Sequence, residues 1–326
     1  MASNQGNGDA KRKIDTTKPV ILEARDVYKA YPIGNTGGMK MVLNDISLIV
    51  SAGSFVTIVG PTGCGKSTFF RQILGAERPT KGKVVVFGKE VTRPDRNRGA
   101  VFQKYSLFPH RRVVDNIAFG LELEKLALLS PYLRPFHSRK LCKMYREKAM
   151  QYLEKFGLAD SAQKYPDGLS GGMSQRVAIA QALIMNPKIL CMDEPFGALD
   201  HATRESMQAF LLDLWCETEM TIFFVTHDLE EGLFMGTRII VMSQYYTNDD
   251  GSPAEGAKIV YDASVPEISP RPTDAKYKSW FVNMLQEIRD QGLNPKHRQR
   301  VEEFNLTHRL AVKDNGNNHG ELNGDK

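Results

Sequence analysis

The chain has 326 residues, and its composition of 41% hydrophobic and 25% charged residues excludes wholesale disorder. Its formal net charge of +5 is modest for this length, so charge alone neither requires nor excludes a nucleic-acid partner. The 4 cysteines form no CxxC pair and lie far apart, which argues against a disulfide scaffold or a structural zinc site. At roughly one domain per 150 residues, we expect two domains, or one domain with attachments.

The two ends of the chain differ from its middle in composition. Residues 1–19 are rich in Asn, Gly, Lys and Asp, and residues 313–326 are polar and of low complexity. Such segments bury too little apolar surface to offset the entropy of ordering, so we predict a disordered arm and a disordered tail. No stretch approaches about 18 consecutive apolar residues, and the N-terminus lacks the apolar region of a secretory signal, so we expect neither a membrane span nor export.

The first predicted element is a small β element. In residues 20–45, short apolar segments are broken by Pro and Gly, a pattern that favours strands joined by turns. Phe55–Val59 is a short β-branched run that ends at Gly60, as expected of a buried central strand. Two similar runs, Ile189–Met192 and Thr221–Val225, end at polar residues. Because an open α/β sheet binds its ligands at the carboxyl ends of its strands, this pattern predicts a nucleotide site there.

Amphipathic helices are predicted between and after these strands. Apolar residues recur at a spacing of about 3.6 in residues 145–156 and again in residues 207–215. A further apolar stripe runs from Trp280 to Ile288 and is ended by Gly292 and Pro295, which predicts an appended C-terminal helix. Packing on the core is the simplest role for this helix, and dimerisation or regulation are the alternatives.

A phosphate-binding loop follows the strand at Phe55–Val59. The next eight residues match GxxxxGK[ST] and lie between a predicted strand and a predicted helix, which is the context that the mechanism requires. Glycines allow backbone N–H groups to converge on phosphate oxygens, and the helix N-terminus adds partial positive charge. Lys66 would reach the β- and γ-phosphates, and Ser67 would ligate Mg²⁺. The loop consists of Gly60, Pro61, Thr62, Gly63, Cys64, Gly65, Lys66 and Ser67.

Two further motifs follow the loop along the chain. The predicted strand Ile189–Met192 is followed by Asp193 and Glu194, paired carboxylates of which the Asp would support the metal in a Walker B arrangement. Between the loop and these carboxylates, the sequence LSGGMSQR at Leu169–Arg176 opens a predicted helix. Taken alone, LSGGMSQR is equally a capped helix start with a glycine turn.

With LSGGM as the signature motif, the chain resembles the ATP-binding subunits of ABC transporters from Ile21 to Tyr261. The resemblance implies an α/β P-loop NTPase of ABC type, with a mixed central sheet, a small antiparallel β element and a helical subdomain. We therefore expect an ATP-binding domain at residues 20–262, its helical subdomain at about 104–168, and a C-terminal helical extension at 263–312.

The same resemblance assigns functions to single residues elsewhere in the chain. Gln103 in VFQKYSLFPH resembles the Q-loop glutamine, Asp200 in GALD belongs to the D-loop, and His227 in VTHD resembles the switch histidine. Tyr31 resembles the aromatic residue that stacks on adenine, and Tyr28 is its competitor three residues away.

ATP hydrolysis with Mg²⁺ is the activity that the resemblance implies. Glu194 would be the base that aligns the attacking water, and Lys66 would neutralise phosphate charge. His227 would hold the region of the γ-phosphate, while Gln103 would touch the metal and the water. The implied metal ligands are Ser67, Gln103 and Asp193, and Thr68 joins the loop residues in contacting the nucleotide.

The resemblance also implies partners. Ser170, Gly171 and Gly172 of the signature motif would contact the ATP of a second subunit, so the competent unit would be a head-to-tail dimer. The stretch PDRNRGAVFQKYSLFPH resembles the nitrate, sulfonate and taurine importer group. Integral membrane permease subunits, and indirectly an extracytoplasmic solute-binding protein, would complete an importer. This chain would lie in the cytoplasm, peripheral on the inner face of the plasma membrane.

The alternative function is a soluble ABC-type ATPase that acts in nucleic-acid repair or translation. One phosphate-binding loop and no sustained heptad pattern disfavour it, so we expect no nucleic-acid partner.

Two stretches depart from the family pattern. One is a longer connection between Ala127 and Lys148, in which Pro131 and Pro135 would break any continuous helix. A tolerated surface insertion is its default interpretation, and a docking contact is the alternative. The other is a longer turn at Tyr245–Ala257, which resembles a hairpin tip.

Overall fold

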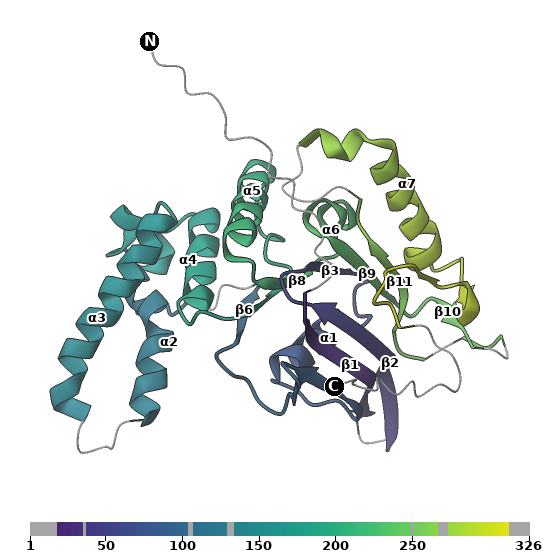
Figure 1. The fold of residues 1–326 in the computed structure, drawn as a ribbon, viewed down its shortest axis with the longest axis horizontal. Coiled ribbons are helices and arrows are strands. Elements are labelled where there is room, and N and C mark those ends of the chain that lie inside the picture. The colour runs from purple at the N-terminus through teal and green to yellow at the C-terminus, as the bar shows by residue number, and fades with distance from the viewer. Residues whose placement is uncertain are drawn as a thin grey trace, which may run out of the picture.

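The computed structural model describes residues 18–34, 37–103, 107–128, 134–248, 251–253, 255–266 and 273–312. Apart from residues 18 and 19, the arm predicted at 1–19 lies outside this part of the chain, and so does the tail predicted at 313–326. The described residues form a seven-stranded sheet, a four-stranded sheet and a two-stranded pair, with helices around them (Figure 1).

The seven-stranded sheet is the centre of the molecule, with strand order β13-β11-β9-β3-β8-β7-β6. From β9 to β6 the neighbours are parallel, and β11 is antiparallel to β9, so the sheet is mixed as predicted. Every residue of β3 and β8 is buried, which explains why both are continuous apolar runs. The three predicted central strands are confirmed as β3, β7 and β8. The strands are β3 Phe55–Val59, β6 Arg98–Phe102, β7 Ile189–Asp193, β8 Thr221–Val225, β9 Arg238–Ser243, β11 Lys258–Ser264 and β13 Asn305–Leu306.

The four-stranded sheet is antiparallel, with strand order β2-β1-β4-β5. The β element predicted at residues 20–45 corresponds to β1 (Val20–Ile33) and β2 (Gly38–Ser51), which are longer than the broken apolar pattern indicated. β4 (Lys81–Val86) and β5 (Lys89–Glu90) were not predicted, because only a short run of valines marks them in the sequence.

Helix α1 (Lys66–Leu74) connects the two sheets. Its apolar residues Phe69, Phe70 and Ile73 are buried in one hydrophobic cluster together with residues of β1, β2 and one face of the central sheet. Burial on both sides fixes the position of the helix, and therefore that of the loop that precedes it.

Helices α2 (Val113–Leu128), α3 (Arg134–Lys155) and α4 (Gly171–Leu183) gather at one end of the molecule (Figure 1). Pro135 lies in the first turn of α3, where a missing N–H costs no hydrogen bond, so a helix begins there; Pro131 lies outside the described residues. None of the described helices is both long enough and apolar enough to cross a membrane. The remaining α-helices are α5 His201–Thr218, α6 Leu229–Met235 and α7 Ser279–Ile288, and the short turns are 3₁₀ helices Ala159–Ser161, Pro166–Gly168, Thr273–Tyr277 and Val301–Glu303 and a π-helix Arg289–Leu293.

The C-terminal extension packs against the antiparallel edge of the central sheet. Helix α7 buries the apolar stripe that the sequence predicts and lies beside α6 (Figure 1). After it, β12 (Gln299–Arg300) pairs with β10 (Tyr246–Thr247), and β13 pairs with β11. The extension therefore contributes short strands in addition to the predicted helix, and β13 covers the edge strand β11.

The hairpin predicted around Tyr245–Ala257 connects β9 and β11. Thr247 and Pro253 form an isolated bridge, and the Asn248 N–H donates to the Ser252 carbonyl at 2.9 Å. The positions 249, 250 and 254 lie outside the described residues.

Candidate active site

The phosphate-binding loop leaves the carboxyl end of β3 and enters α1. A Cβ on Gly60 would lie 2.1 Å from the Met242 carbonyl oxygen, so only glycine fits there. Gly65, the N-cap of α1, has a φ of 103° and supplies no side-chain cap. The N–H groups of the first turn are therefore available to an anion. The buried Lys66 ammonium donates to the carbonyl oxygens of Gly60 at 2.7 Å and Pro61 at 3.0 Å.

Asp193 and Ser67 lie together beside the loop. Asp193 ends β7, and the Ser67 hydroxyl is a hydrogen-bond partner of its carboxylate. Burial raises the pKa of Asp193, and the neighbouring Glu194 carboxylate adds to this shift, whereas Ser67 and the Lys66 ammonium oppose it. Carboxylate and hydroxyl oxygens at one point are the donors that Mg²⁺ prefers, so the two residues fit the predicted metal site.

Glu194 and His227 face each other across neighbouring strands. The Glu194 N–H donates to the Val225 carbonyl at 2.8 Å, which fixes the end of β7 against the end of β8. Its backbone has a φ of 46°, a left-handed conformation that is uncommon for a residue with a side chain. The Glu194 carboxylate lies 3.3 Å from His227 Nδ1, and the His227 side chain is 58% exposed. A carboxylate and an imidazole thus meet at the carboxyl ends of two neighbouring strands.

Gln103 follows the strand beside β7, and Asp200 precedes helix α5. Gln103 follows β6, which pairs with β7 so that Phe102 lies opposite Asp193. The Gln103 amide is close to Gly197 of the GALD segment, because a Cβ on that glycine would lie 3.2 Å from Gln103 Nε2. Asp200 caps α5, where its carboxylate accepts from the Thr203 N–H at 3.1 Å.

The signature segment lies on a different helix. Ser170 caps α4 and accepts from the Met173 N–H at 3.3 Å, and both Ser170 and Gly171 are exposed. Gly172 is buried, and a Cβ there would lie 2.7 Å from Thr203 Cγ2 of α5. Within the described part of the chain, no hydrogen bond joins this segment to residues 60–67.

Tyr31 and Tyr28 are the two candidates for stacking on adenine, and their contacts differ. The Tyr31 hydroxyl donates to Glu77 at 2.6 Å and also interacts with Thr68 in α1; burial, followed by the bond to Glu77, raises its pKa. Tyr28 pairs with Lys81 of β4. A lysine ammonium lies over each ring, Lys81 at 4.9 Å from the Tyr28 centroid and Lys29 at 5.1 Å from the Tyr31 centroid, so the contact with α1 is what distinguishes Tyr31. Tyr31 is thus the tyrosine beside the phosphate-binding helix.

Sequence reasoning missed two acidic residues that hold site residues in place. Glu77 accepts from Tyr31 and lies 2.9 Å from the Lys29 ammonium. Glu231, in the first turn of α6, accepts a hydrogen bond from Thr226, the residue before His227. Glu231 lies early in a helix, where acidic residues usually serve the helix dipole, so the sequence alone offers no signal for a second role.

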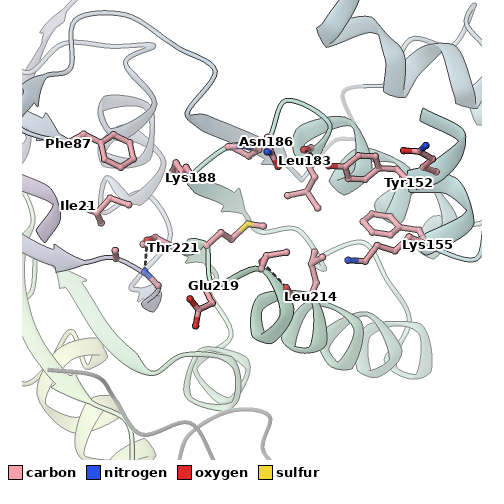
Figure 2. A pocket seen from close by; sticks show the side chains of 17 residues that line it. Ile21, Phe87, Tyr152, Lys155, Leu183, Asn186, Lys188, Leu214, Glu219 and Thr221 are labelled. Carbon is pink, nitrogen blue, oxygen red and sulfur yellow. Dashed lines mark hydrogen bonds between the residues drawn. The ribbon is translucent and has the colours of Figure 1, made fainter. Parts of the chain in front are cut away.

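A cavity of about 550 Å³ lies away from this site (Figure 2). Its lining includes Thr221 at the start of β8, Lys188 just before β7 and Gly53 just before β3, so it lies at the amino ends of the parallel strands. The loop and His227 follow the carboxyl ends of β3 and β8, and Asp193 is the last residue of β7. The cavity is therefore separate from the predicted nucleotide site.

Comparisons with known proteins agree with this geometry. Residues 43–197 match the family model described as ABC transporter. Over 222 residues the chain is 41% identical to the nitrate import ATP-binding protein of Synechocystis sp., covering 68% of this chain and 77% of that protein. It is 39% identical over 206 residues to the aliphatic sulfonates import ATP-binding protein of Bacillus cereus, covering 63% and 75%. A solved dimeric ATP-binding cassette in a post-hydrolysis state, bound to ADP and Pi, is 28% identical, with a TM-score of 0.60 and coverage of 76% of this chain and 100% of that chain.

Proposed function

Because this chain belongs to the ABC transporter family, we propose that it is the ATP-binding and ATP-hydrolysing subunit that powers a membrane importer for a small anion. The P-loop fold of ABC type predicted from the sequence is confirmed by the solved cassettes. Nitrate and aliphatic sulfonates are named for the two relatives above, and the sequence resemblance adds taurine.

The observation that carries the proposal is that three groups of predicted site residues lie at the carboxyl ends of neighbouring strands. The loop after β3, the carboxylates after β7 and the histidine after β8 follow the carboxyl ends of three neighbouring parallel strands. Positioning and charge stabilisation are what phosphoryl transfer requires of a protein, and this arrangement supplies both.

Lys66 would bind the β- and γ-phosphates by exchanging two carbonyl partners for phosphate oxygens. At about 4 Å and an effective dielectric near 20, one such charge pair is worth about 4 kcal/mol before desolvation is subtracted. The proposed nucleotide contacts are Tyr31, Gly60, Pro61, Thr62, Gly63, Cys64, Gly65, Lys66, Ser67, Thr68, Ser170, Gly171, Gly172 and Asp200.

Ser67, Asp193 and Gln103 are the residues that would hold Mg²⁺. The ion, when bound, supplies positive charge to the phosphate oxygens. Among the three, Ser67 and Asp193 already interact, whereas the Gln103 amide lies against Gly197.

Glu194 is the proposed base that orients and deprotonates the attacking water. His227, 3.3 Å from its carboxylate, would keep Glu194 in place and reach the γ-phosphate.

The exposed signature segment would act on the nucleotide of a second subunit. Ser170 and Gly171 open α4 toward solvent, and a helix N-terminus of this kind is a ready site for a γ-phosphate. The complete unit would be a head-to-tail dimer bound to integral membrane permease subunits, peripheral on the cytoplasmic face, with a solute-binding protein acting on the far side.

Measuring ATP binding and phosphate release separately tests the proposal. Glu194→Gln should bind ATP with unchanged affinity but release phosphate at least about 100-fold more slowly, since a base is lost and no binding group is removed. Lys66→Ala, the matched contrast, should lose ATP binding itself. Phosphate release by Glu194→Gln at the rate of the unaltered chain would reject the assignment of the base.

A further inference from the structure

A buried carboxylate lies behind the loop that carries His227. Glu231 is 7% exposed, and each of its two oxygens accepts one hydrogen bond. The Thr226 hydroxyl donates to Oε2 at 2.7 Å, and Gln208 Nε2 donates to Oε1 at 3.0 Å. Burying a carboxylate is costly unless its oxygens are bonded, and both are bonded here.

Hydrogen bonds connect this carboxylate to the residues on both sides of His227. The Asp228 N–H donates to the Thr226 hydroxyl at 3.1 Å, and the Glu231 N–H donates to the Asp228 carboxylate at 3.1 Å. The residues on both sides of His227 are therefore joined to each other and to Glu231. The His227 side chain itself is mostly exposed, so this loop is what directs the imidazole toward Glu194.

The network also reaches the helix that begins at the D-loop. Gln208 belongs to α5, which starts just after Asp200. Arg204 of the same helix donates to the Leu199 carbonyl in the GALD segment at 3.1 Å, and its charge acts on Glu231. One buried carboxylate thus connects the histidine loop with the start of α5.

We propose that Glu231 is a positioning residue, which holds His227 in register with Glu194 through the Thr226 hydroxyl. This inference rests on the proposed function, because it gives His227 and Glu194 their roles in hydrolysis. It predicts that loss of the Thr226–Glu231 bond lowers turnover and leaves ATP binding intact, since neither Thr226 nor Glu231 belongs to the phosphate-binding loop.

The decisive variant is Thr226→Val, which removes the hydroxyl and preserves the shape of the side chain. Misplacement of a catalytic group by about 1 Å costs up to about 100-fold, so we expect kcat to fall about 10- to 100-fold with KM changed less than about threefold. Thr226→Ser restores the hydroxyl and should recover turnover to within about threefold of the unaltered chain. Glu231→Leu should lower kcat in the same way if it folds.

Thr221→Val is the matched control. Thr221 begins β8, the strand that Thr226 follows, and the two threonines are similarly buried, at 1% and 2% exposed. The Thr221 hydroxyl accepts from the Gly53 N–H at 3.0 Å, at the amino end of the strand. It should lower the thermal midpoint to a similar extent and leave kcat unchanged.

Three quantities, measured on the unaltered chain and on each variant, test the proposal: kcat, KM and the thermal midpoint. If Thr226→Val hydrolyses ATP as fast as Thr221→Val, or if Thr226→Ser fails to recover turnover, the positioning role is wrong while the proposed function stands. If the unaltered chain hydrolyses no ATP, the proposed function itself is wrong, and the role of Glu231 falls with it.

Discussion

Single residues of the site differ in how they are held. The Lys66 ammonium is held by hydrogen bonds to two backbone carbonyls of its own loop, and the Tyr31 hydroxyl by a hydrogen bond to Glu77. His227 makes its contact from a loop whose backbone is hydrogen-bonded to Thr226. These neighbours determine which side chain meets the nucleotide when several of one type are available. The tyrosines of β1 are the clearest case.

Tyr31→Ala should weaken ATP binding, and Tyr28→Ala should not. Stacking of a base on an aromatic ring is worth about 1 to 3 kcal/mol, so we expect the dissociation constant to rise at least about fivefold for the first variant. Tyr28→Ala, at the position of β1 that pairs with Lys81 of β4, should change it less than about twofold. Titration with a fluorescent ATP analogue measures both, and an equal or larger effect of Tyr28→Ala would contradict the assignment.

At the scale of elements, the C-terminal extension joins the core through buried polar contacts. Arg238 of β9 and Asp262 of β11 form a bidentate ion pair, and each side chain is 3% exposed. The His308 N–H donates to the Asp262 carbonyl at 2.8 Å, and its Nδ1 accepts from the Leu310 N–H at 3.1 Å. The end of the extension is therefore attached to the sheet beside a buried charge pair.

His308 should make this attachment weaker in acid. Burial, followed by the charges of Arg238 and Arg309, lowers the pKa of His308 to about 3, against about 6.5 in the unfolded chain. Between these values the unfolded chain binds a proton that the folded chain does not, so the free energy of unfolding falls as pH falls below about 6.5.

His308→Asn keeps an acceptor for the Leu310 N–H and cannot titrate. Its thermal midpoint should therefore drop less than that of the unaltered chain between about pH 7.5 and pH 5. His297→Asn, at an exposed position of the same extension, is the control and should leave the drop unchanged. An identical drop for His308→Asn and the unaltered chain would exclude a contribution from His308.

Sequence reasoning succeeded for elements that are marked by consecutive residues of one type. The buried central strands are confirmed because each is a continuous apolar run, and the predicted loop and carboxylate segments lie at the carboxyl ends of two of them. β12 and β13 are two-residue strands that exist only because β10 and β11 offer partners, so no local pattern marks them. Glu77 and Glu231 act on residues 46 and 5 positions away, through contacts that the fold creates.

At the scale of the whole molecule, the exposed N-terminus of α4 bears on how many copies of the chain form one nucleotide site. Ser170 and Gly171 face solvent, while the phosphate-binding loop lies at the edge of the sheet on another element of the chain. If a second copy supplies the signature segment, nucleotide bound without turnover must hold two copies together. This expected association of two copies does not depend on where the ATP-binding domain, predicted at residues 20–262, ends and the extension at 263–312 begins.

Ser170→Arg places a long cation at the proposed contact between two copies. Combined with Glu194→Gln, it should prevent ATP-dependent association. It should leave the affinity of a single copy for ATP within about threefold, because Ser170 caps α4 and, in the described part of the chain, no hydrogen bond joins it to residues 60–67. An equal loss of ATP affinity in dilute, monomeric protein would show that Ser170 serves the nucleotide of its own chain.

The most direct test of the account is the molar mass of Glu194→Gln in solution, measured by light scattering with and without saturating Mg²⁺-ATP. We predict a monomer without nucleotide and a species of twice that mass with it. A monomer that binds ATP stoichiometrically and stays a monomer would contradict the shared site.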